Sequence, residues 1–414
     1  MLLLGIDVSE TARIKKSMVN KRFCKEILGE EEYKQLAMRS FPAESVAASF
    51  SAKEAFSKAV GTGLGAFDFS EVQLLREKSG RPFLKLDGKA AELARNFSFS
   101  VSVTHSGGYA AAVVAGEKIQ CGIGIGKTEK EKLQSIIKNR PFDGNKGDFG
   151  RLMCVCGSEG MAGAAIMSAG AALRCGAGLV DVALPRCIYP VVSSQFSEPI
   201  FTLLDSGPSG KLSEESAVSF KKSLSKASAC LIGCGLGKSS AAREEVSAVL
   251  SKASVPLIID ADGINIISEN INILKTARVP VILTPHPGEM SRLLKTSVSD
   301  VQANRKKYAA DFSARYNVVL ALKGAGTVVA APDGRLYENH TGNPGMAKGG
   351  SGDVLAGMVS SLAAQGIDPF EAASAAVYLH GLAGDMCAEK FSQGAMLPTD
   401  IIGMLPGLFL QIGR

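Results

Sequence analysis

The sequence of 414 residues is poor in several residue types that point to particular functions, because it has no tryptophan, only four histidines and 6% aromatic residues. So few histidines argue against a histidine-rich metal centre. No apolar run reaches the roughly 18–20 residues that cross a bilayer, so we expect no membrane helix. The apolar start Met1–Leu4 has no basic region before it and is soon interrupted by Asp7, which argues against a signal peptide.

Net charge and cysteine content further restrict the class of protein to which this chain can belong. The net charge of +6 is mild and scattered, so we expect no nucleic-acid partner. The nine cysteines are odd in number and lack metal-ligand spacing, which predicts reduced thiols in the cytoplasm. With 46% hydrophobic and 21% charged residues the chain is globular, and its length predicts two or three domains.

The sequence pattern changes along the chain. We assign residues 1–121 to a first domain, 122–138 to a linker, because the stretch Gly122–Lys146 contains Gly, Lys and Asn, and 139–414 to a second domain. In the first domain, a few predicted helices occur together with predicted strands that would pair in antiparallel fashion. This combination predicts an α+β fold. Its clearest elements are the strand Leu2–Ile6, the helix Glu44–Val60, and the paired strands Phe97–Val103 and Tyr109–Val114 with His105 between them.

In the second domain, short apolar runs alternate with helical patterns such as Gly160–Cys175 and Ala241–Lys252. This repetition predicts a doubly wound, mostly parallel α/β sheet, in which ligands bind beyond the carboxyl ends of the strands. The predicted strands are Leu152–Cys156, Leu179–Ala183, Ala229–Ile232, Leu257–Ile259, Val281–Leu283 and Val318–Leu322.

The most informative motif runs from Asn343 to Asp353, directly before the apolar helix Val354–Ala363. Glycines before a helix free its first amides to converge on an anion, which predicts an anion hole at Gly349, Gly350, Ser351 and Gly352. Asp353 would stand beside a bound phosphate, where a carboxylate accepts the proton of an attacking hydroxyl. A lone Gly-Asp pair would more often be a plain helix cap, but the whole stretch favours phosphoryl transfer.

This motif resembles the Gly-x-Gly-Asp anion hole of the ribokinase-like superfamily. Roughly residues 139–414 resemble one branch of it, the NAD(P)H-hydrate dehydratase family, through several motifs in the family's order. These are Lys146–Gly150, Val155–Ser158, Gly163–Ala165, Gly233–Gly237, Asp260–Asn265, Thr284–Glu289 and Leu322–Thr327.

The resemblance implies a reaction in which ADP or ATP phosphorylates the hydroxyl of hydrated NADH or NADPH, after which phosphate is eliminated. Ala164, Gly237, His286 and Asp353 would then contact the hydrate, with Asp353 as the base. The nucleotide would be bound by Lys323, Gly324, Ala325, Gly326 and Thr327, with Gly352 at its phosphates. A kinase of a small alcohol would use the same Asp353 site, so that alternative stays open.

Two glycine-rich stretches, Gly233–Ser239 and Gly122–Thr128, look like phosphate-binding P-loops. Each has three residues between its outer glycines, whereas the P-loop needs four. We therefore exclude a P-loop at both places.

In the first domain, two acids, a lysine and a histidine form a second candidate site. Asp7 and Glu54 are the carboxylates that magnesium prefers, and Lys58 and His105 are suited to hold phosphates. Glu54 and Lys58 are four residues apart on a predicted helix and therefore share a face. Taken separately, Glu54 and Lys58 would also fit a surface ion pair, and Asp7 would also fit a turn at the end of a strand.

Roughly residues 1–116 resemble the holo-acyl-carrier-protein synthase type of 4′-phosphopantetheinyl transferase, with Ser79–Pro82 matching a turn of that family. By this resemblance, Asp7 and Glu54 would bind Mg²⁺, and Lys58 and His105 would contact coenzyme A. Arg13 would face the carrier protein, and Lys58 would also act in catalysis. The reaction transfers phosphopantetheine from coenzyme A to a serine of acyl carrier protein, a step of fatty acid biosynthesis.

Three positions depart from the transferase pattern: Ser49 replaces a frequent Arg, Ser100 a frequent His, and Gly122–Gly126 lacks acids. We expect an active transferase because the metal pair and His105 are kept. The alternative is an inactive carrier-binding or oligomerisation module in front of a small-molecule kinase. In either case we expect a homo-oligomer. A flexible linker would allow the two domains to assemble with different oligomeric symmetries.

Overall fold

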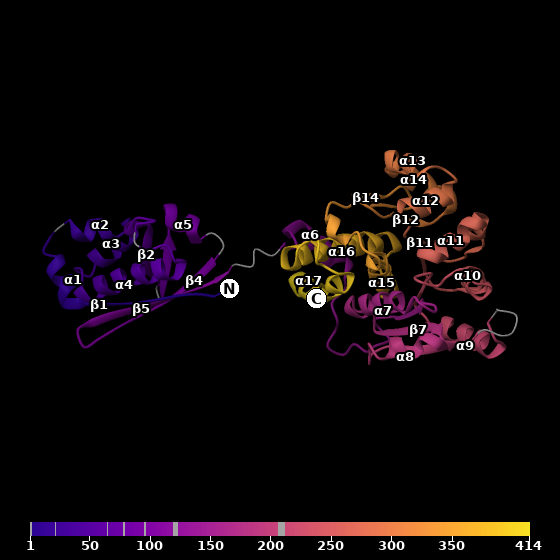
Figure 1. The fold of residues 1–414 in the computed structure, drawn as a ribbon, viewed down its shortest axis with the longest axis horizontal. Coiled ribbons are helices and arrows are strands. Elements are labelled where there is room, and N and C mark those ends of the chain that lie inside the picture. Colours follow the sequence, from indigo (N-terminus) through magenta and orange to yellow (C-terminus); the bar gives the residue numbers. More distant parts are fainter. Residues whose placement is uncertain are drawn as a thin grey trace. The chain divides into compact units, whose positions relative to one another are not determined.

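The computed structural model describes residues 2–20, 22–63, 65–77, 79–94, 97–118, 123–205 and 212–414. The chain divides into two compact units, Met1–Gly122 and Ile123–Arg414 (Figure 1). Within the described ranges, none of the helices combines the length and the apolar character that a membrane span requires.

A three-stranded antiparallel sheet forms the centre of the first unit, with β5 (Tyr109–Lys118) between β1 (Leu2–Glu10) and β4 (Phe97–Ser106). Helix α4 (Ala43–Val60) packs across one face of this sheet. A Cβ atom on Gly5 would lie 1.9 Å from the Ala55 carbonyl oxygen, so only glycine permits this close approach of helix and strand. The approach fixes β1 against the helix that carries Glu54 and Lys58.

A fully buried ion pair joins α4 to α3 (Glu30–Ala37) and β2 (Val72–Arg76). Lys53 Nζ lies 2.7 Å from Glu32 Oε2, and Glu32 also accepts the N–H groups of Gly29 and Leu74. The pair thereby links α3, α4 and β2. The smaller elements are α1 (Thr11–Ser17), α2 (Phe23–Ile27), α3 (Glu30–Ala37), β2 (Val72–Arg76), β3 (Pro82–Leu86) and α5 (Gly88–Ala94).

In the described part of the second unit, nine strands form one sheet in the order β14-β13-β12-β11-β10-β9-β6-β7-β8. The seven strands from β12 to β8 are parallel, and β13 and β14 extend the sheet in antiparallel fashion. The predicted doubly wound, mostly parallel sheet is thus confirmed. Its strands are β6 (Arg151–Val155), β7 (Leu179–Pro185), β8 (Ile200–Leu204), β9 (Ala229–Ile232), β10 (Leu257–Ile259), β11 (Val281–Leu283), β12 (Val319–Leu322), β13 (Val328–Ala330) and β14 (Leu336–Glu338).

Helices cover both faces of this sheet, because alternate strand residues point to opposite sides. Leu152 and Cys154 of β6 belong to one core, whereas Met153 and Val155 belong to the other. The first core includes α6 (Lys127–Ile136), α7 (Ala162–Arg174), α8 (Tyr189–Ser193), α15 (Ser351–Ala364), α16 (Pro369–Phe391) and α17 (Pro398–Ile412). The second includes α9 (Glu214–Leu224), α10 (Ser240–Lys252), α11 (Ala261–Glu269), α12 (Pro287–Leu294), α13 (Val298–Ala303) and α14 (Arg305–Tyr316).

The segment assigned above to a linker, residues 122–138, instead contains helix α6; its first residue lies outside the described residues. Leu133 and Ile137 are buried in the first core of the second unit. The Gln134 side chain donates to the Ile412 carbonyl oxygen at 2.7 Å, which attaches α6 to the end of α17. Burial of these two apolar side chains outweighs the polar composition that indicated a linker.

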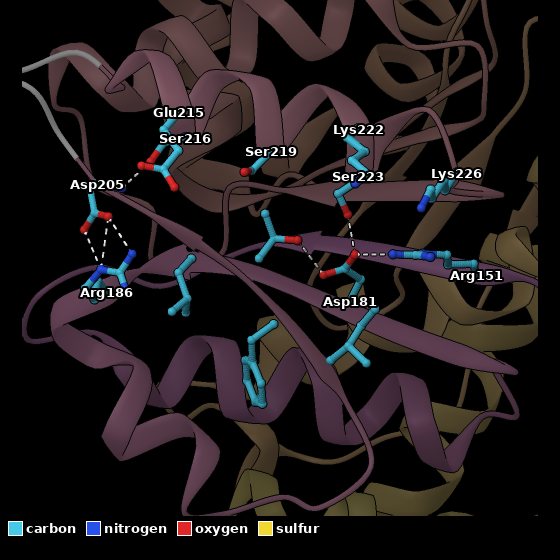
Figure 2. A pocket seen from close by; sticks show the side chains of 14 residues that line it. Arg151, Asp181, Arg186, Asp205, Glu215, Ser216, Ser219, Lys222, Ser223 and Lys226 are labelled. Carbon is cyan, nitrogen blue, oxygen red and sulfur yellow. Dashed lines mark hydrogen bonds and ion pairs between the residues drawn. The ribbon is translucent and has the colours of Figure 1, made fainter.

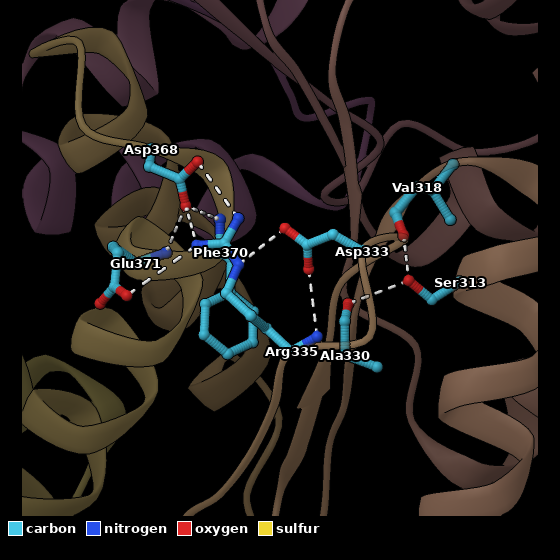
Figure 3. A network of polar contacts seen from close by, with 8 residues as sticks. All are labelled: Ser313, Val318, Ala330, Asp333, Arg335, Asp368, Phe370 and Glu371. Atoms are coloured by element: carbon cyan, nitrogen blue, oxygen red, sulfur yellow. Dashed lines mark hydrogen bonds and ion pairs between the residues drawn. The ribbon is translucent and has the colours of Figure 1, made fainter.

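An arginine network anchors the antiparallel extension of the sheet (Figure 3). Arg335, just before β14, lies 2.8 Å from Asp333 and 2.9 Å from Asp368 at the start of α16. Its guanidinium also lies 4.7 Å from the centre of the Phe370 ring. The β13–β14 turn is therefore fixed to α16, the helix that packs behind α15.

Candidate active site

The polar residues predicted for the second unit gather at the carboxyl ends of four neighbouring parallel strands. Gly233 follows β9, Asp260 follows β10, His286 comes shortly after β11, and Lys323 follows β12. The carboxyl ends of parallel strands share one edge of a sheet, so these residues are brought together. The strand order also reverses direction between β6 and β9, which is where doubly wound sheets bind ligands.

A buried ion pair forms the floor of this site. Lys323 Nζ lies 2.6 Å from Asp260 Oδ1, and the side chains are 17% and 1% exposed. Burial alone lowers the pKa of a lysine, but the charges of Asp260 and Glu289 outweigh it and raise the pKa of Lys323. Lys323 therefore stays protonated as a fixed positive charge.

Helix α15 points its N-terminus at this ion pair. Gly350 precedes the helix with φ +100°, and a Cβ atom on Gly352 would lie 3.2 Å from Lys323 Nζ. Gly349 has open space around it. The free first amides of α15 and the adjacent ammonium group together favour an anion at this point.

Asp353 lies in the first turn of α15 rather than before the helix, because α15 begins at Ser351. Burial and the negative charge of Asp260 raise the pKa of Asp353 to about 6. At neutral pH the group is thus mostly ionised, yet it is far more basic than an ordinary aspartate. Such a carboxylate is suited to accept a proton from a hydroxyl group.

His286 caps α12 and has both ring nitrogens oriented. The Gly288 N–H donates to Nδ1 at 3.0 Å, and Nε2 lies 3.5 Å from Glu289 Oε1. Burial, together with the charges of Lys323 and Arg292, lowers the pKa of His286. The ring is therefore neutral at pH 7 and carries its proton on Nε2, which makes it a hydrogen-bond donor rather than a base.

Ala164 of α7 packs against the loop that follows β9, and Gly237 belongs to this loop. A Cβ atom on Gly235 would lie 2.6 Å from the Ala164 Cβ, so the loop packs directly on α7. The Gly237 N–H donates to Asp262 Oδ2 at 2.8 Å. Asp262 thus holds the loop in place, a role that the sequence pattern did not indicate.

Asp262 also connects this loop to the helix behind His286. Its Oδ1 accepts from the Asn265 side chain at 3.3 Å, and Asn265 Oδ1 accepts from Arg292 Nε at 2.9 Å. The next residue back, Ala261, adopts the left-handed region with φ +46°, which is rare for a residue other than glycine. Backbone strain of this kind concentrates at functional sites.

Arg305 shapes the loop Lys323–Thr327, although no motif surrounds this arginine in the sequence. The Arg305 guanidinium donates to the carbonyl oxygens of Leu322 at 2.7 Å and of Gly326 at 3.2 Å. Gly324 and Gly326 have positive φ, and Thr327 Oγ1 donates to the Gly324 carbonyl oxygen at 2.9 Å. Ala325 lies at the tip of this turn between the two glycines.

A second unpredicted residue, His380 of α16, lies 3.5 Å from Ser351 Oγ. Burial, with a smaller effect of Lys323, lowers the pKa of His380 to about 4. The ring is therefore neutral behind the start of α15.

In the first unit, Asp7 lies in the middle of β1 and not at the end of a strand, because β1 continues to Glu10. Lys58 Nζ lies 2.8 Å from Asp7 Oδ1 and 3.1 Å from the Ile6 carbonyl oxygen. Burial and the nearby charge of Asp7 raise the pKa of Glu54. Asp7, Glu54 and Lys58 therefore form one cluster, with the ion pair running from Lys58 to Asp7.

Within the described residues, His105 and Arg13 make no hydrogen bond or ion pair with this cluster. His105 belongs to β4 itself, not to the turn, and it lies opposite Ala110 on the same sheet face as Asp7. Among the described residues, no hydrogen bond or ion pair joins His105 to Asp7, Glu54 or Lys58. Arg13 is exposed on α1, and its charge acts weakly on Glu54.

The two departures from the transferase pattern that fall on described residues leave this cluster intact. Ser49 is buried in α4, and Ser100 is exposed on the sheet face that points away from α4. The described residues contain no group of three or more His, Cys, Asp or Glu side chains placed to hold a metal. Magnesium commonly takes only one or two carboxylates, so the pair Asp7 and Glu54 fits it.

Comparison with known proteins separates the chain into the same two parts. Residues 152–407 match the family model of NAD(P)H-hydrate dehydratase, and residues 3–114 match that of the 4′-phosphopantetheinyl transferase superfamily. The chain is therefore similar to a fusion of the two.

Among curated relatives, the bifunctional NAD(P)H-hydrate repair enzyme of Moorella thermoacetica is 41% identical over 273 residues, which are 66% of this chain and 52% of the relative. The chain thus spans about half the length of the curated relatives of this kind that it matches.

Two solved structures show the same fold as the second unit. A ribokinase-like protein from Enterococcus faecalis has a TM-score of 0.60 and 31% identity, covering 68% of this chain and 94% of its own. The ADP/ATP-dependent NAD(P)H-hydrate dehydratase of Bacillus subtilis, co-crystallised with ATP and Mg²⁺, has a TM-score of 0.58 and 29% identity, covering 68% and 97%. Through its ribokinase-like unit, the chain belongs to the NAD(P)H-hydrate dehydratase family.

Proposed function

We propose that the second unit converts (S)-NAD(P)H hydrate back to NAD(P)H with ADP or ATP as phosphoryl donor. The observation that supports this most is the position of Asp353, a basic carboxylate in the first turn of a glycine-initiated helix that faces Lys323. Hydroxide leaves a ring carbon poorly, whereas phosphate leaves readily, so phosphorylation of the hydroxyl makes its elimination possible.

In this mechanism Asp353 accepts the proton of the ring hydroxyl as its oxygen attacks the terminal phosphorus of the nucleotide. The amides of Gly349, Gly350, Ser351 and Gly352 stabilise the charge on the transferred group. Asp260 Oδ1 lies 2.6 Å from Lys323 Nζ, and this ion pair holds the ammonium group beside the transferred phosphoryl group. Phosphate then leaves with the electrons of the carbon–oxygen bond, and loss of a proton from the neighbouring ring carbon restores the dihydronicotinamide.

The other predicted contacts receive roles that fit their positions. The loop Lys323–Thr327 binds the adenine nucleotide, while Ala164, Gly237 and His286 contact the hydrate. The neutral His286 ring donates from Nε2. The carboxylate of Asp260 beside the anion hole suits a nucleotide-bound Mg²⁺, which would neutralise phosphate charge when present.

Counting the products tests this proposal against the kinase alternative. We expect one AMP from ADP, or one ADP from ATP, for each NADH formed, with free phosphate and no lasting phosphorylated alcohol. Mass spectrometry of nucleotides and phosphate during turnover measures this ratio. A stable phosphate ester formed from a small alcohol, without formation of NADH, would favour the kinase.

We further propose that the first unit is a holo-acyl-carrier-protein synthase. Asp7 and Glu54 would hold Mg²⁺, whose charge would offset the burial and the repulsion by Asp7 that raise the pKa of Glu54. Lys58, released from Asp7, would contact the phosphates of coenzyme A together with His105 and neutralise the leaving phosphate. Arg13, exposed at the same end, would contact the acyl carrier protein.

Removing both carboxylates tests the transferase. In the double variant Asp7→Asn with Glu54→Gln, we expect at least about a hundredfold loss of labelled pantetheine transfer to apo carrier protein, because the metal-bound diphosphate is no longer stabilised. Glu44→Gln, an exposed change on the same helix α4, is the control and should be neutral. A wild-type chain that binds the carrier without modifying it would support the inactive-module alternative.

Asp262 provides a test of how the hydrate is held. Asp262→Ala frees the Gly237 loop, so we expect KM for the hydrate to rise about tenfold while KM for the nucleotide is unchanged. Asp262→Asn keeps an acceptor oxygen and should restore most of the affinity. An equal rise of both KM values in Asp262→Ala would indicate general disruption instead of local positioning.

We also propose self-association of the first unit and a cytoplasmic location. Leu4, Ile6 and Val8 lie on the face of β1 away from α4 and are 57%, 53% and 58% exposed. A row of exposed apolar side chains on a sheet is typical of an interface. Eight cysteines of the described residues are free thiols, which fits a reducing compartment.

A further inference from the structure

A cavity of about 340 Å³ lies beside the edge strand β8, away from the residues of the candidate active site (Figure 2). Helix α9 forms one wall, and the consecutive residues Ile200–Leu203 of β8 form the other. Adjacent strand residues point to opposite sides, so a wall of four in a row means that the cavity opens on the edge of the strand. The edge of a sheet presents backbone groups without a ladder partner.

The face of α9 that lines this cavity is polar. Phe220 and Leu224 bury the apolar stripe of the helix in the second core, as expected for a helix packed on a sheet. The neighbouring stripe, which faces the cavity, carries Glu215, Ser216, Ser219, Lys222 and Ser223, and Lys226 follows just after the helix. Polar side chains at this spacing provide several donors directed at one place.

A buried carboxylate holds an arginine at the same end of the cavity. Asp181 is 1% exposed and lies 2.6 Å from Arg151 NH2. It also accepts from Thr202 Oγ1 at 2.9 Å and from Ser223 Oγ. Arg151 Nε is buried and has no hydrogen-bond partner within the described part of the chain. The guanidinium is therefore fixed in orientation by Asp181, and the part of the Arg151 side chain that stays exposed, 25%, lines the cavity.

The charges at this end are unbalanced in favour of cations. Lys222 and Lys226 form no ion pair with any described carboxylate, and Asp181 balances only Arg151. Arg186 at the opposite end is already paired with Asp205 at 2.9 Å. An anion is therefore favoured near Arg151 and disfavoured near Asp205.

We propose that this cavity binds a small phosphate-bearing molecule, with the phosphate between Arg151, Lys222 and Lys226. Ser219 and the free backbone edge of β8 provide further donors. Arginine and lysine together with hydroxyl groups form the usual donor set for a phosphate group. The site is separate from the anion hole at α15, and it does not depend on the proposed dehydratase activity.

Hydrogen–deuterium exchange of the full chain with inorganic phosphate tests the site. We expect phosphate to slow exchange in two places, residues 200–204 with 214–224 and residues 349–354 at the anion hole. In the double variant Lys222→Gln with Lys226→Gln, protection of residues 200–204 and 214–224 should require at least about tenfold more phosphate. Protection of residues 349–354 should be unchanged. The protection at 349–354 thus serves as an internal control for folding.

A matched variant and a salt control complete the test. Lys221→Gln with Lys252→Gln removes two lysines from a smaller neighbouring cavity and should keep the protection of α9. Protection confined to 349–354, or protection of α9 that survives loss of Lys222 and Lys226, would overturn the proposal. So would equal protection by sodium chloride at the same ionic strength.

Discussion

Asp353→Asn removes the dehydratase activity and at the same time stabilises the folded chain. Loss of the base costs about 10²–10⁴ in rate, because nothing else accepts the hydroxyl proton as it is transferred. The fold raises the pKa of Asp353 from 3.8 to about 6, so ionised Asp353 destabilises the native state at neutral pH. Because asparagine is never ionised, the variant avoids this cost, and its free energy of unfolding exceeds that of the wild type by up to about 3 kcal/mol.

The same carboxylate sets the pH dependence of the wild type. The base acts only when ionised, so kcat/KM should fall about tenfold per pH unit below pH 6 and level off above it. The stability gain of Asp353→Asn should be absent below about pH 3.8, should grow as the pH rises to 6, and should stay constant above. Rate profiles and urea unfolding of both proteins measure these trends; normal turnover by the variant would contradict the role of Asp353.

Lys53→Met destabilises the first unit by about 3–5 kcal/mol, because Glu32 is then left as an unpaired charge in the core. Both side chains of this pair are fully buried, and Glu32 cannot reach water. The second change Glu32→Gln removes that charge and should recover a large part of the loss. Urea unfolding followed by hydrogen exchange in the peptides of α4 isolates the first unit from the second.

Lys34→Met is the matched control for this prediction. Its partner Glu30 lies 2.6 Å away, but both side chains are exposed, so breaking the pair should produce no measurable change. Equal effects of Lys53→Met and Lys34→Met would show that burial does not determine the importance of these pairs.

Lys53 illustrates where sequence patterns mislead about function. It stands next to Glu54 in a motif that resembles a transferase site, yet its ammonium group contacts Glu32 and the carbonyl oxygens of Phe69 and Val72 in the core. Neighbours on a helix point in different directions, and only the packing of α3 and β2 against α4 reveals which one is buried.

The second unit was predictable where motifs follow strands and unpredictable where distant segments meet. Asp353, His286 and Lys323 lie in recognisable stretches at strand or helix ends, so their common edge follows from the parallel sheet. Arg305 and His380 reach the site from helices whose own sequences contain no motif. The short strands β13 and β14 were not predicted. Strands of the same length, β10 and β11, are marked by the helices that flank them, whereas no helix separates β12, β13 and β14.

The first strand shows a different limit. Asp7 and Ser9 suggest that the strand ends early, and the prediction stopped at Ile6. In the structure β1 continues to Glu10. Asp7 and Ser9 point toward α4, whereas Leu4, Ile6 and Val8 are exposed on the opposite face. The usual inward direction of apolar side chains is inverted here, as expected if the outer face of the sheet is covered in an assembly.

The most direct test is the appearance of the dihydronicotinamide absorbance when the full chain is mixed with (S)-NADH hydrate, Mg²⁺ and either ADP or ATP. We expect absorbance to rise only when a nucleotide is present, at a rate that identifies the preferred donor, and to stay flat with Asp353→Asn. Folded wild-type protein that produces no rise with either nucleotide would contradict the proposed dehydratase.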